Sequence, residues 1–428
     1  MRLQFYFSQL LKIPPDAGDD PANRHIRRNF FTNTLHQMAV FLGDSFIAYQ
    51  TILPVYAATL TRSPVLIGLV PAIIDTGWFL PQLFFAPVVE RLPRRKPLVL
   101  ILGVVERLPV LLLALLAFWL PGLEGNAPIS IFLALIIWKA IAGGFAGLPW
   151  QDFIARVIPV WLRGRFFGIA HFGGKLLGLG AASLTGLILM RLAYPANYAL
   201  VFLLGFLALS LSLVFFALTV ETATPVAPRQ PAGSRAFREQ AWSILKENHN
   251  FSLYLVSRGL SYMGGMATAF IAIYALQSFQ LVDAYAAVFT TILFAASSLG
   301  LLGWGGLRDR YGSKRVLVSS ALLWAAALGV LLLWKTLPAV YLAFVLVGLS
   351  SPGNIIGDIN MPMEFDTGPR RPTYIGLART LTSPVLLIAP VAAGVVVQSA
   401  GFAPMFAISL FFTLGGLALL ALGVRDPG

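Results

Sequence analysis

The sequence predicts an all-α membrane protein with twelve transmembrane helices in two pseudo-symmetric six-helix halves. Of its 428 residues, 57% are hydrophobic and 11% are charged, whereas soluble domains carry about 25% charged residues. The apolar residues gather in runs of the roughly 20 residues that a membrane helix needs. Positive charges collect in alternate connections between these runs, and the second half of the chain repeats polar positions of the first.

Twelve apolar runs are separated by polar or turn-forming residues. The stretch between the sixth and seventh runs is rich in Pro, Ala, Arg and Glu, a composition typical of a polar linker. We therefore expect an N-terminal segment (1–32), a first six-helix bundle (33–220), a linker (221–250) and a second six-helix bundle (251–424). The predicted helices are 33–59, 64–86, 97–119, 129–150, 166–190, 197–219, 251–276, 284–306, 316–334, 337–357, 374–398 and 403–423.

The lysines and arginines predict the orientation. In this arrangement 23 of the 31 lie on the side of the termini, and three lie on the opposite side. Cytoplasmic loops carry the excess of positive charge, so we expect both termini in the cytoplasm and the protein in a membrane of the bacterial inner-membrane type. The net charge of +13 follows this topology and forms no single patch, which argues against nucleic acid as a partner.

The chain lacks the residues that several kinds of chemistry require. The chain has no cysteine, which excludes disulfides, thiolate nucleophiles and cysteine-bearing metal sites. Its four histidines are scattered, and neither a metal-binding H-x-x-x-H pattern nor a phosphate-binding G-x-x-x-x-G-K-[ST] loop occurs. We therefore predict no metal, no cofactor and no enzymatic activity. A polytopic membrane enzyme or a channel is the alternative of another class.

A short basic turn, Gly305–Arg315, separates the eighth and ninth runs, and Gly312 gives it the backbone freedom of a sharp turn. Its pattern G-x-L-x-D-R-x-G-x-K-R resembles the loop signature of the major facilitator superfamily (MFS), a family of twelve-helix secondary transporters. A second copy, Pro87–Lys96, follows the second helix, with Glu90 in place of Asp and Pro93 in place of Gly. The resemblance implies the MFS fold, with a substrate path at the midplane between two parallel halves.

Other polar positions of the two halves match in constant order, which supports an internal repeat. The matched sets are Asn29 with Asn250, Glu90-Arg91 with Asp309-Arg310, Asp152 with Asn360, and Arg163, Phe166 and Gly168 with Arg371, Tyr374 and Gly376.

Charged groups inside a bilayer are costly and need a partner or a watery cavity. In the first helix Gln37, Asp44 and Thr51 recur every seven residues and form a polar stripe on one face. This stripe is expected to line a central cavity, or else to pack against another helix. Asp75 on the second helix is a further acid at mid-depth.

The third and fourth helices add more charges. Glu106 and Arg107 are adjacent, so they are expected to face different neighbours. Lys139-Ala140-Ile141-Ala142-Gly143 resembles the R-x-x-x-G motif of proton-coupled MFS exporters, with lysine in the arginine position. The resemblance implies a proton relay at Lys139, which burial makes chemically possible for a lysine. The alternative is a static ion pair with Asp44 or Asp75.

The second half is predicted to hold Arg258 and Arg379 but no carboxylate at depth. Arg258 is expected to bind an acidic group, either on the substrate or on Asp44, or else to extend to the cytoplasmic surface. The tenth helix is expected to break at 351–354, where Asn354 is a further candidate for the substrate site.

The resemblance implies alternating access, with the basic turns acting as latches between the halves. Glu90 is expected to pair with Arg371 or Arg379, and Asp309 with Arg163 or Arg165. The remaining candidates for these gating loops are Arg91, Arg95, Arg310, Gly312 and Lys314.

The sequence thus predicts a secondary active transporter of a small solute, proton-coupled and monomeric in the lipid bilayer. Export is favoured over uptake or uniport by the fourth-helix motif. The fifth helix lacks the G-P dipeptide of the family's antiporters, which weighs against drug–proton antiport. The motifs do not identify the substrate.

Overall fold

The computed structural model describes residues 25–90, 92–221, 242–366 and 371–426, and the regular secondary structure of this part of the chain is helical. Most of the predicted N-terminal segment and linker, together with Arg91, therefore lies outside the described residues. The side chains of Glu90 and Arg371 also lie outside them.

The first half of the chain forms seven helices and one short 3-10 turn. They are α2 (Ile26–Phe46), α3 (Ile52–Leu60), α4 (Pro64–Glu90), α5 (Lys96–Leu116), η3 (Leu120–Gly122), α6 (Ala127–Val157), α7 (Val160–Arg191) and α8 (Ala196–Ala217).

The second half forms six helices, a 3-10 turn and a terminal π-helix. They are α10 (His249–Gly264), η4 (Gly265–Ala267), α11 (Thr268–Ser278), α12 (Ala284–Leu333), α13 (Leu337–Glu364), α14 (Arg371–Ala400), α15 (Phe402–Ala418) and η5 (Leu419–Gly423).

The described residues form twelve helical passages when the two arms of α12 are counted separately. In this count α2 with α3, and α10 with α11, are single passages with a break. Nine of the described helices are long and apolar enough to cross a membrane. Gly312 has a φ of +80° inside α12, a conformation that glycine adopts without steric cost. The predicted turn is confirmed, but it is confined to this residue.

Two predictions about helix continuity were wrong. The first helix is not continuous over 33–59, because α2 ends at Phe46 and α3 begins at Ile52. The tenth helix does not break at 351–354, because α13 continues through Pro352 to Glu364. Side chains of the neighbouring α12 stabilise the turn before this proline. Trp304 donates to the carbonyl of Leu349 at 2.7 Å, and Ser320 donates to that of Ser350 at 2.6 Å.

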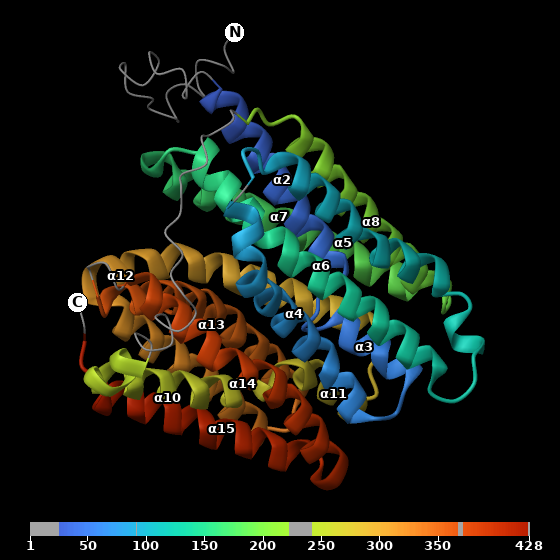
Figure 1. Ribbon diagram of the computed structural model, residues 1–428. Helices are drawn as coiled ribbons and strands as arrows, with labels where there is room; N and C mark the ends of the chain where they lie inside the picture. Colours follow the sequence, from blue (N-terminus) through green and yellow to red (C-terminus); the bar gives the residue numbers. More distant parts are fainter. Residues whose placement is uncertain (1–24, 91, 222–241, 367–370, 427–428) are drawn as a thin grey trace.

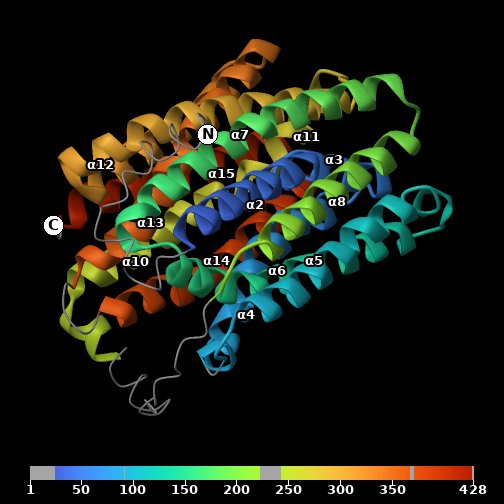
Figure 2. The same ribbon diagram turned by 90° about the horizontal axis from the view of Figure 1, so that it is seen from above.

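The two halves lie side by side, with their helices running in the same general direction (Figure 1). We call the end where α2 and α10 begin and η5 ends the terminal end, and the other the opposite end. In the first half α2 lies between α7 and α8 (Figure 2). The halves meet where α4 packs against α14 and α7 packs against α12. At Gly68 in α4 the backbones are so close that a Cβ atom would lie 2.4 Å from the carbonyl oxygen of Pro390.

The hydrophobic core shows where the halves are joined. Toward the opposite end a single cluster contains residues of both halves, among them Phe46, Tyr56, Phe270 and Phe289. Toward the terminal end the buried residues form two separate clusters, one around Phe153 in the first half and one around Phe251 in the second. The halves therefore share a core at the opposite end and have separate cores at the terminal end.

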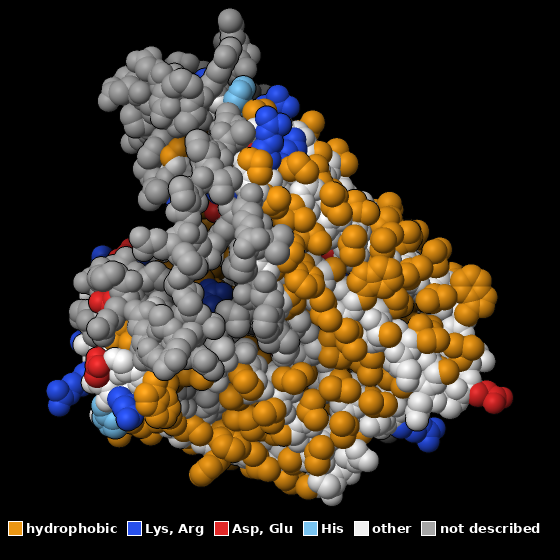
Figure 3. All heavy atoms as spheres, viewed as in Figure 1, with side chains coloured by type: hydrophobic (Ala, Val, Ile, Leu, Met, Phe, Trp, Pro, Cys, Tyr) orange, Lys and Arg blue, Asp and Glu red, His pale blue; other side chains and the backbone are white. Residues whose placement is uncertain are grey.

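The outer surface is that of a protein surrounded by hydrocarbon. Hydrophobic side chains cover the flank seen in Figure 3, and the charged side chains of this face gather at its two ends. Exposed leucines such as Leu187, Leu302 and Leu422 belong to this surface. Such a large exposed apolar area is expected only where a membrane covers it.

One of the predicted repeat matches is visible as a pair of equivalent contacts. The amide of Asn29 donates to the carbonyl of Val220 at 2.9 Å, and the N–H of Val220 donates back to Asn29 Oδ1 at 2.9 Å. The amide of Asn250 exchanges the same two bonds with Arg425, at 2.9 and 2.7 Å. In each half, an asparagine near the start of the first helix thus holds the chain that follows the last helix.

We expect Asn29→Ala to reduce the free energy of unfolding by about 1–3 kcal/mol, because it leaves two backbone groups without partners. Asn250→Ala should cost less, since its partners are closer to solvent. Denaturant unfolding in detergent micelles measures both.

Asn360→Ala is the matched control, because the Asn360 amide bonds only a carbonyl of its own helix, that of Ile356. Equal losses for the three variants would contradict a clamping role of the two asparagines.

Candidate functional site: paired charges beside the seam of the two halves

Three charged side chains from three helices of the first half meet near mid-depth. Lys139 Nζ on α6 lies 3.9 Å from Asp44 Oδ1 on α2 and 3.7 Å from Glu106 Oε1 on α5. The exposed fractions are 15% for the lysine, 18% for Glu106 and 49% for Asp44. We call these residues the acidic triad, because two carboxylates share one ammonium group. A second cation, Arg107, lies 3.2 Å from Glu106 Oε2, so the charges balance when all four groups are ionised.

Asp44 is the most solvent-accessible member of the triad. It lies 18 residues into α2, about 27 Å from the start of the helix at 1.5 Å per residue, yet half of its side chain is accessible. The helix ends two residues later, and the broken segment 47–51 follows. Interrupted helices at membrane depth are tolerated where they lie within protein or line a water-filled cavity. The break at this position is therefore compatible with a solute or proton site.

Arg107 adjoins the triad through Glu106, but two of its bonds are to another helix. Its side chain is buried, and its guanidinium donates to Leu209 O at 2.7 Å and to Ser212 Oγ at 2.8 Å, both on α8. Its Nη1 also lies 3.2 Å from Glu106 Oε2. As predicted, Glu106 and Arg107 face different helices. Arg107 fixes α5 to α8 and is not placed to meet a solute at the seam.

Asp75 and Gln37 are half-buried on α4 and α2. Asp75 has no ion pair among the described residues. The ion pair of Lys139 is therefore with Asp44 and Glu106, which excludes the predicted alternative with Asp75 in this conformation.

The second half holds a closed charge pair that sequence reasoning missed. Arg258 on α10 is buried, and its Nε lies 2.7 Å from Asp358 Oδ1 on α13. Its Nη2 and the Tyr262 hydroxyl both donate to Asp358 Oδ2 at 2.9 Å. The guanidinium also lies 4.8 Å from the ring centroid of Tyr262 and 3.5 Å from Asn354 Oδ1.

The expectation that the second half has no carboxylate at depth was therefore wrong. Asp358 escaped detection because the predicted tenth helix ended at residue 357, whereas α13 continues to Glu364. Arg258 is neutralised within its own half, so it binds neither Asp44 nor the membrane surface in this conformation. The signal in the sequence was the run Ile355–Met361, whose apolar residues continue the helical pattern past Asp358.

The bonds described between the halves lie from mid-depth to the opposite end. Lys175 on α7 donates to Ser297 on α12, and the hydroxyls of Thr51 and Thr290 are 2.5 Å apart. Beyond them the Tyr198 hydroxyl donates to Asp283 Oδ2 at 2.8 Å. Together with the shared core, these bonds hold the opposite end closed.

At the terminal end the predicted latch between Asp309 and Arg163 is not formed. Arg163 donates to the carbonyls of Ala155 and Ile158 in its own half. Asp309 is exposed, and the partner described for it is the adjacent Arg308, at 3.7 Å. The latch is therefore a prediction only for a conformation in which the terminal ends approach each other.

Within each half, the basic turns fasten the helix ends. Arg95 is buried and donates to Asp152 Oδ2 at 2.7 Å, and the carboxylate of Glu221 accepts the backbone N–H groups of residues 95 and 96. In the other half Lys314 donates to the carbonyl of Ala421 at 3.0 Å. Arg310 is exposed on the same turn.

Comparisons with known proteins agree with this architecture. The family model of the Major Facilitator Superfamily matches residues 254–428. No curated protein sequence matches the chain. Among solved structures, the nucleoside transporter NupG is similar with a TM-score of 0.66 and 14% identity, covering 92% of this chain and 97% of that one.

Two further structures resemble the chain equally well. The xylose transporter XylE from E. coli, in a partially occluded inward-open conformation, has a TM-score of 0.66 and 14% identity, over 94% of this chain and 98% of that one. A bacterial homologue of the iron transporter ferroportin, in an inward-facing state, has a TM-score of 0.67 and 14% identity, over 92% and 98%.

Two helical halves joined along a seam, with charged groups held inside the membrane, are the architecture of a secondary transporter. Residues 254–428 match the family model of the Major Facilitator Superfamily, and the whole chain has the fold of the solved transporters named above.

Breaking the buried pair of the second half should destabilise the protein. We expect Asp358→Asn to cost about 3–5 kcal/mol in unfolding free energy, because it leaves the buried Arg258 charge without its partner. Arg258→Gln should cost less, because 24% of the Asp358 side chain is exposed. The double variant should recover most of the loss, and denaturant unfolding in micelles measures all three. If the double variant is as unstable as the sum of the single variants, the two residues do not act as a pair.

The Tyr198–Asp283 bond should make closure of the opposite end depend on pH. Burial raises the pKa of the Asp283 carboxyl, and the hydrogen bond from Tyr198 offsets part of this rise. Asp283 is half-buried in the closed state, so the closed state binds the proton of this carboxyl more readily than the open state does. Acid therefore favours closure, and closure weakens as the pH rises through the raised pKa of Asp283. Distances between spin labels at Arg191→Cys and Lys335→Cys should therefore lengthen as the pH rises.

Asp283→Asn should remove this pH dependence, because an amide oxygen accepts the bond from Tyr198 without titrating. Tyr198→Phe should lengthen the label distance at every pH. An unchanged pH profile in Asp283→Asn would show that another group controls this end.

Proposed function

We propose that the chain transports a small solute by alternating access, that transport is coupled to protons, and that the solute is exported. The observation that carries the coupling is the acidic triad. It holds two carboxylates against one ammonium group, and its most accessible member lies beside the break between α2 and α3.

The coupling follows from the loose pairing of Asp44. Glu106 is paired with Arg107 at 3.2 Å as well as with Lys139 at 3.7 Å, whereas Lys139 at 3.9 Å is the one cation beside Asp44 in the ion pairs described. Half of the Asp44 side chain is accessible, so of the two acids it is the one that can exchange a proton with water, and a carboxylate at membrane depth is costly without a close partner. When the site changes its access from one side of the membrane to the other, it would carry the proton bound to Asp44.

The conformational change consists of the two halves rocking about the shared core. In the conformation described, the opposite end is closed by Tyr198–Asp283 and Thr51–Thr290, and the cores at the terminal end are separate. The excess of Lys and Arg at the terminal end supports its assignment to the cytoplasm, which makes this a conformation open to the inside. The two rocking units are residues 33–220 and 251–424, within a single chain in the bilayer.

Export is the direction that the resemblance of Lys139–Gly143 to the exporters' motif supports. Uptake and uniport are the rival modes on the same fold. A screen of candidate solutes with proteoliposomes separates them: an exchanging exporter moves protons against the solute, an uptake symporter moves both together, and a uniporter moves no proton.

We expect Asp44→Asn to abolish proton movement driven by a solute gradient while exchange of the solute across the membrane continues, because the amide mimics a permanently protonated carboxyl. A pH-sensitive dye inside the proteoliposomes and a radiolabelled solute measure the two fluxes.

Asp152→Asn is the matched control, since Asp152 is a membrane-helix carboxylate that pairs with Arg95 and Arg156 away from the triad. Solute-driven proton movement in Asp44→Asn at the wild-type rate would reject Asp44 as the coupling residue.

A further inference from the structure

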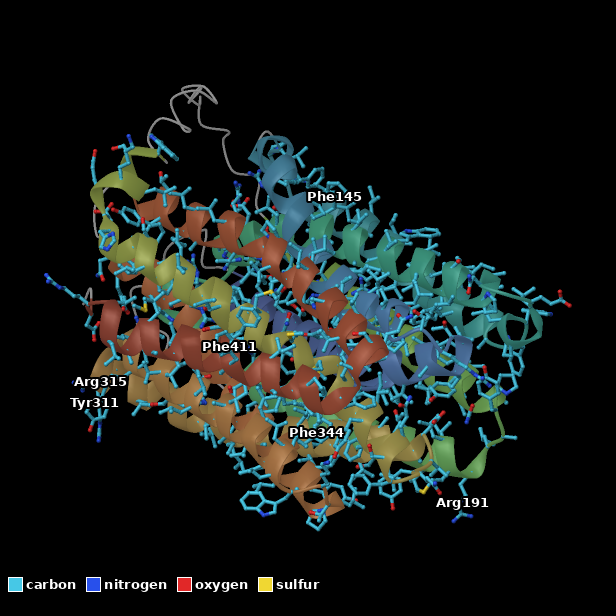
Figure 4. The ribbon with its side chains drawn as sticks, turned by 90° about the horizontal axis from the view of Figure 1, so that it is seen from below. Phe145, Arg191, Tyr311, Arg315, Phe344 and Phe411 are labelled. Carbon is cyan, nitrogen blue, oxygen red and sulfur yellow. The ribbon has the colours of Figure 1, made fainter. Side chains whose placement is uncertain are left out.

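A groove lies on the outer side of the second half where α12 bends at Gly312. It has a volume of about 580 Å³, and both arms of α12 and the end of the chain line it. Figure 4 shows Tyr311 and Arg315 at this end of the molecule, extending outward from α12. The lining residues are Leu307, Tyr311, Lys314, Arg315, Val318, Ser319, Ala421 and Asp426.

The groove presents positive charge on fixed side chains. Lys314 donates one N–H to the carbonyl of Ala421 at 3.0 Å, which leaves the other N–H groups of the ammonium for a ligand. The Arg315 guanidinium lies 5.4 Å from the ring centroid of Tyr311, so the ring limits its freedom. Asp426 is the single acid of the lining, and the groove as a whole carries one net positive charge.

Polar and apolar groups are arranged in order along α12. The Ser319 hydroxyl, one turn after Arg315, has no hydrogen-bond partner described in this part of the chain. Leu322 follows on the same side of the helix and is exposed. The cations thus lie at the end of the molecule and the exposed leucine nearer its middle, as head group and acyl chains are arranged in one leaflet of a bilayer.

We propose that this groove binds an anionic phospholipid, with the phosphate held by Lys314, Arg315 and the Ser319 hydroxyl. A phosphodiester with one negative charge matches the net charge of the groove, and both cations are suited to phosphate oxygens. Basic pockets between membrane helices at the head-group level are known binding sites for anionic lipids. The acyl chains lie along Leu322.

This site is separate from the transport pathway, and it does not depend on proton coupling or on the direction of transport. It places the lipid on the bend of α12, where Gly312 joins the two arms. Asp309, the acid of the predicted latch, lies on the same turn. The lipid is therefore bound next to a segment that is expected to move when the terminal ends approach each other.

Lipid binding to the purified full-length chain tests the proposal. Phosphatidylglycerol, phosphatidylcholine and inorganic phosphate are titrated in turn into the protein in a neutral detergent, and bound ligand is counted by native mass spectrometry. We expect phosphatidylglycerol to bind, and Arg315→Gln to weaken it about fivefold, the effect of one cation at an anionic membrane surface. Arg310→Gln is the matched control, because Arg310 is an exposed cation of the same turn outside the groove.

Asp426→Asn should change the affinity for phosphatidylglycerol in the direction opposite to Arg315→Gln. Removing the only acid of the lining should strengthen phosphatidylglycerol binding, whereas a site for a zwitterionic head group would lose the partner of its amine. Ser319→Leu should fill the groove and weaken binding without changing charge. The melting temperature of each variant in the same detergent shows that it is folded.

Four outcomes would overturn the proposal. They are equal weakening by Arg310→Gln and Arg315→Gln, equal binding of phosphatidylcholine, weaker phosphatidylglycerol binding in Asp426→Asn, and inorganic phosphate binding as tightly as the lipid. The last would show a site for free phosphate.

Discussion

The cost of an ionised group inside hydrocarbon governs this structure. Each charge in the helices needs a partner within the protein, and these partners determine which helices pack together. Arg107 bonds α5 to α8, Arg258 bonds α10 to α13, and Lys139 draws α2 and α5 toward α6. Because hydrocarbon offers lipid-facing side chains no hydrophobic gain from association, these few polar contacts specify the arrangement.

The two halves satisfy this requirement differently. In the second half Arg258 is buried, and its pair with Asp358 is neutral, close and completed by Tyr262, which suits a fixed structural element. In the first half Lys139 is shared between Asp44 and Glu106 at 3.9 and 3.7 Å, and Glu106 is also paired with Arg107. Asp44 is therefore loosely paired, and half of its side chain is accessible. This difference in pairing and exposure is the physical basis for proposing coupling in the first half.

The two halves are alike in how each bundle of helices is held together. Asn29 and Asn250 make the same reciprocal bonds to the chain that leaves the last helix of each half. This contact closes each bundle on itself at the terminal end, where the halves have separate cores. Each half therefore holds its shape without the other at that end, as a unit must if it is to rock about a shared core.

The sequence by itself determined the architecture. Runs of about 20 apolar residues and the one-sided placement of Lys and Arg both follow from what a bilayer permits, and local composition reports them. The match of Asn29 with Asn250 indicated the internal repeat. The turn at Gly312 could also be predicted, since its φ of +80° favours glycine. The prediction that Glu106 and Arg107 face different helices required only helix geometry.

Only the tertiary structure decided how the charges are paired and where two helices break or continue. The partners Arg258 and Asp358 are 100 residues apart, and no local pattern identifies one as the partner of the other. The tenth helix was expected to break at 351–354, but Trp304 and Ser320 from α12 bond the turn before Pro352. These outcomes depend on which side chains of other helices lie within about 3 Å of a group, and packing alone sets that distance.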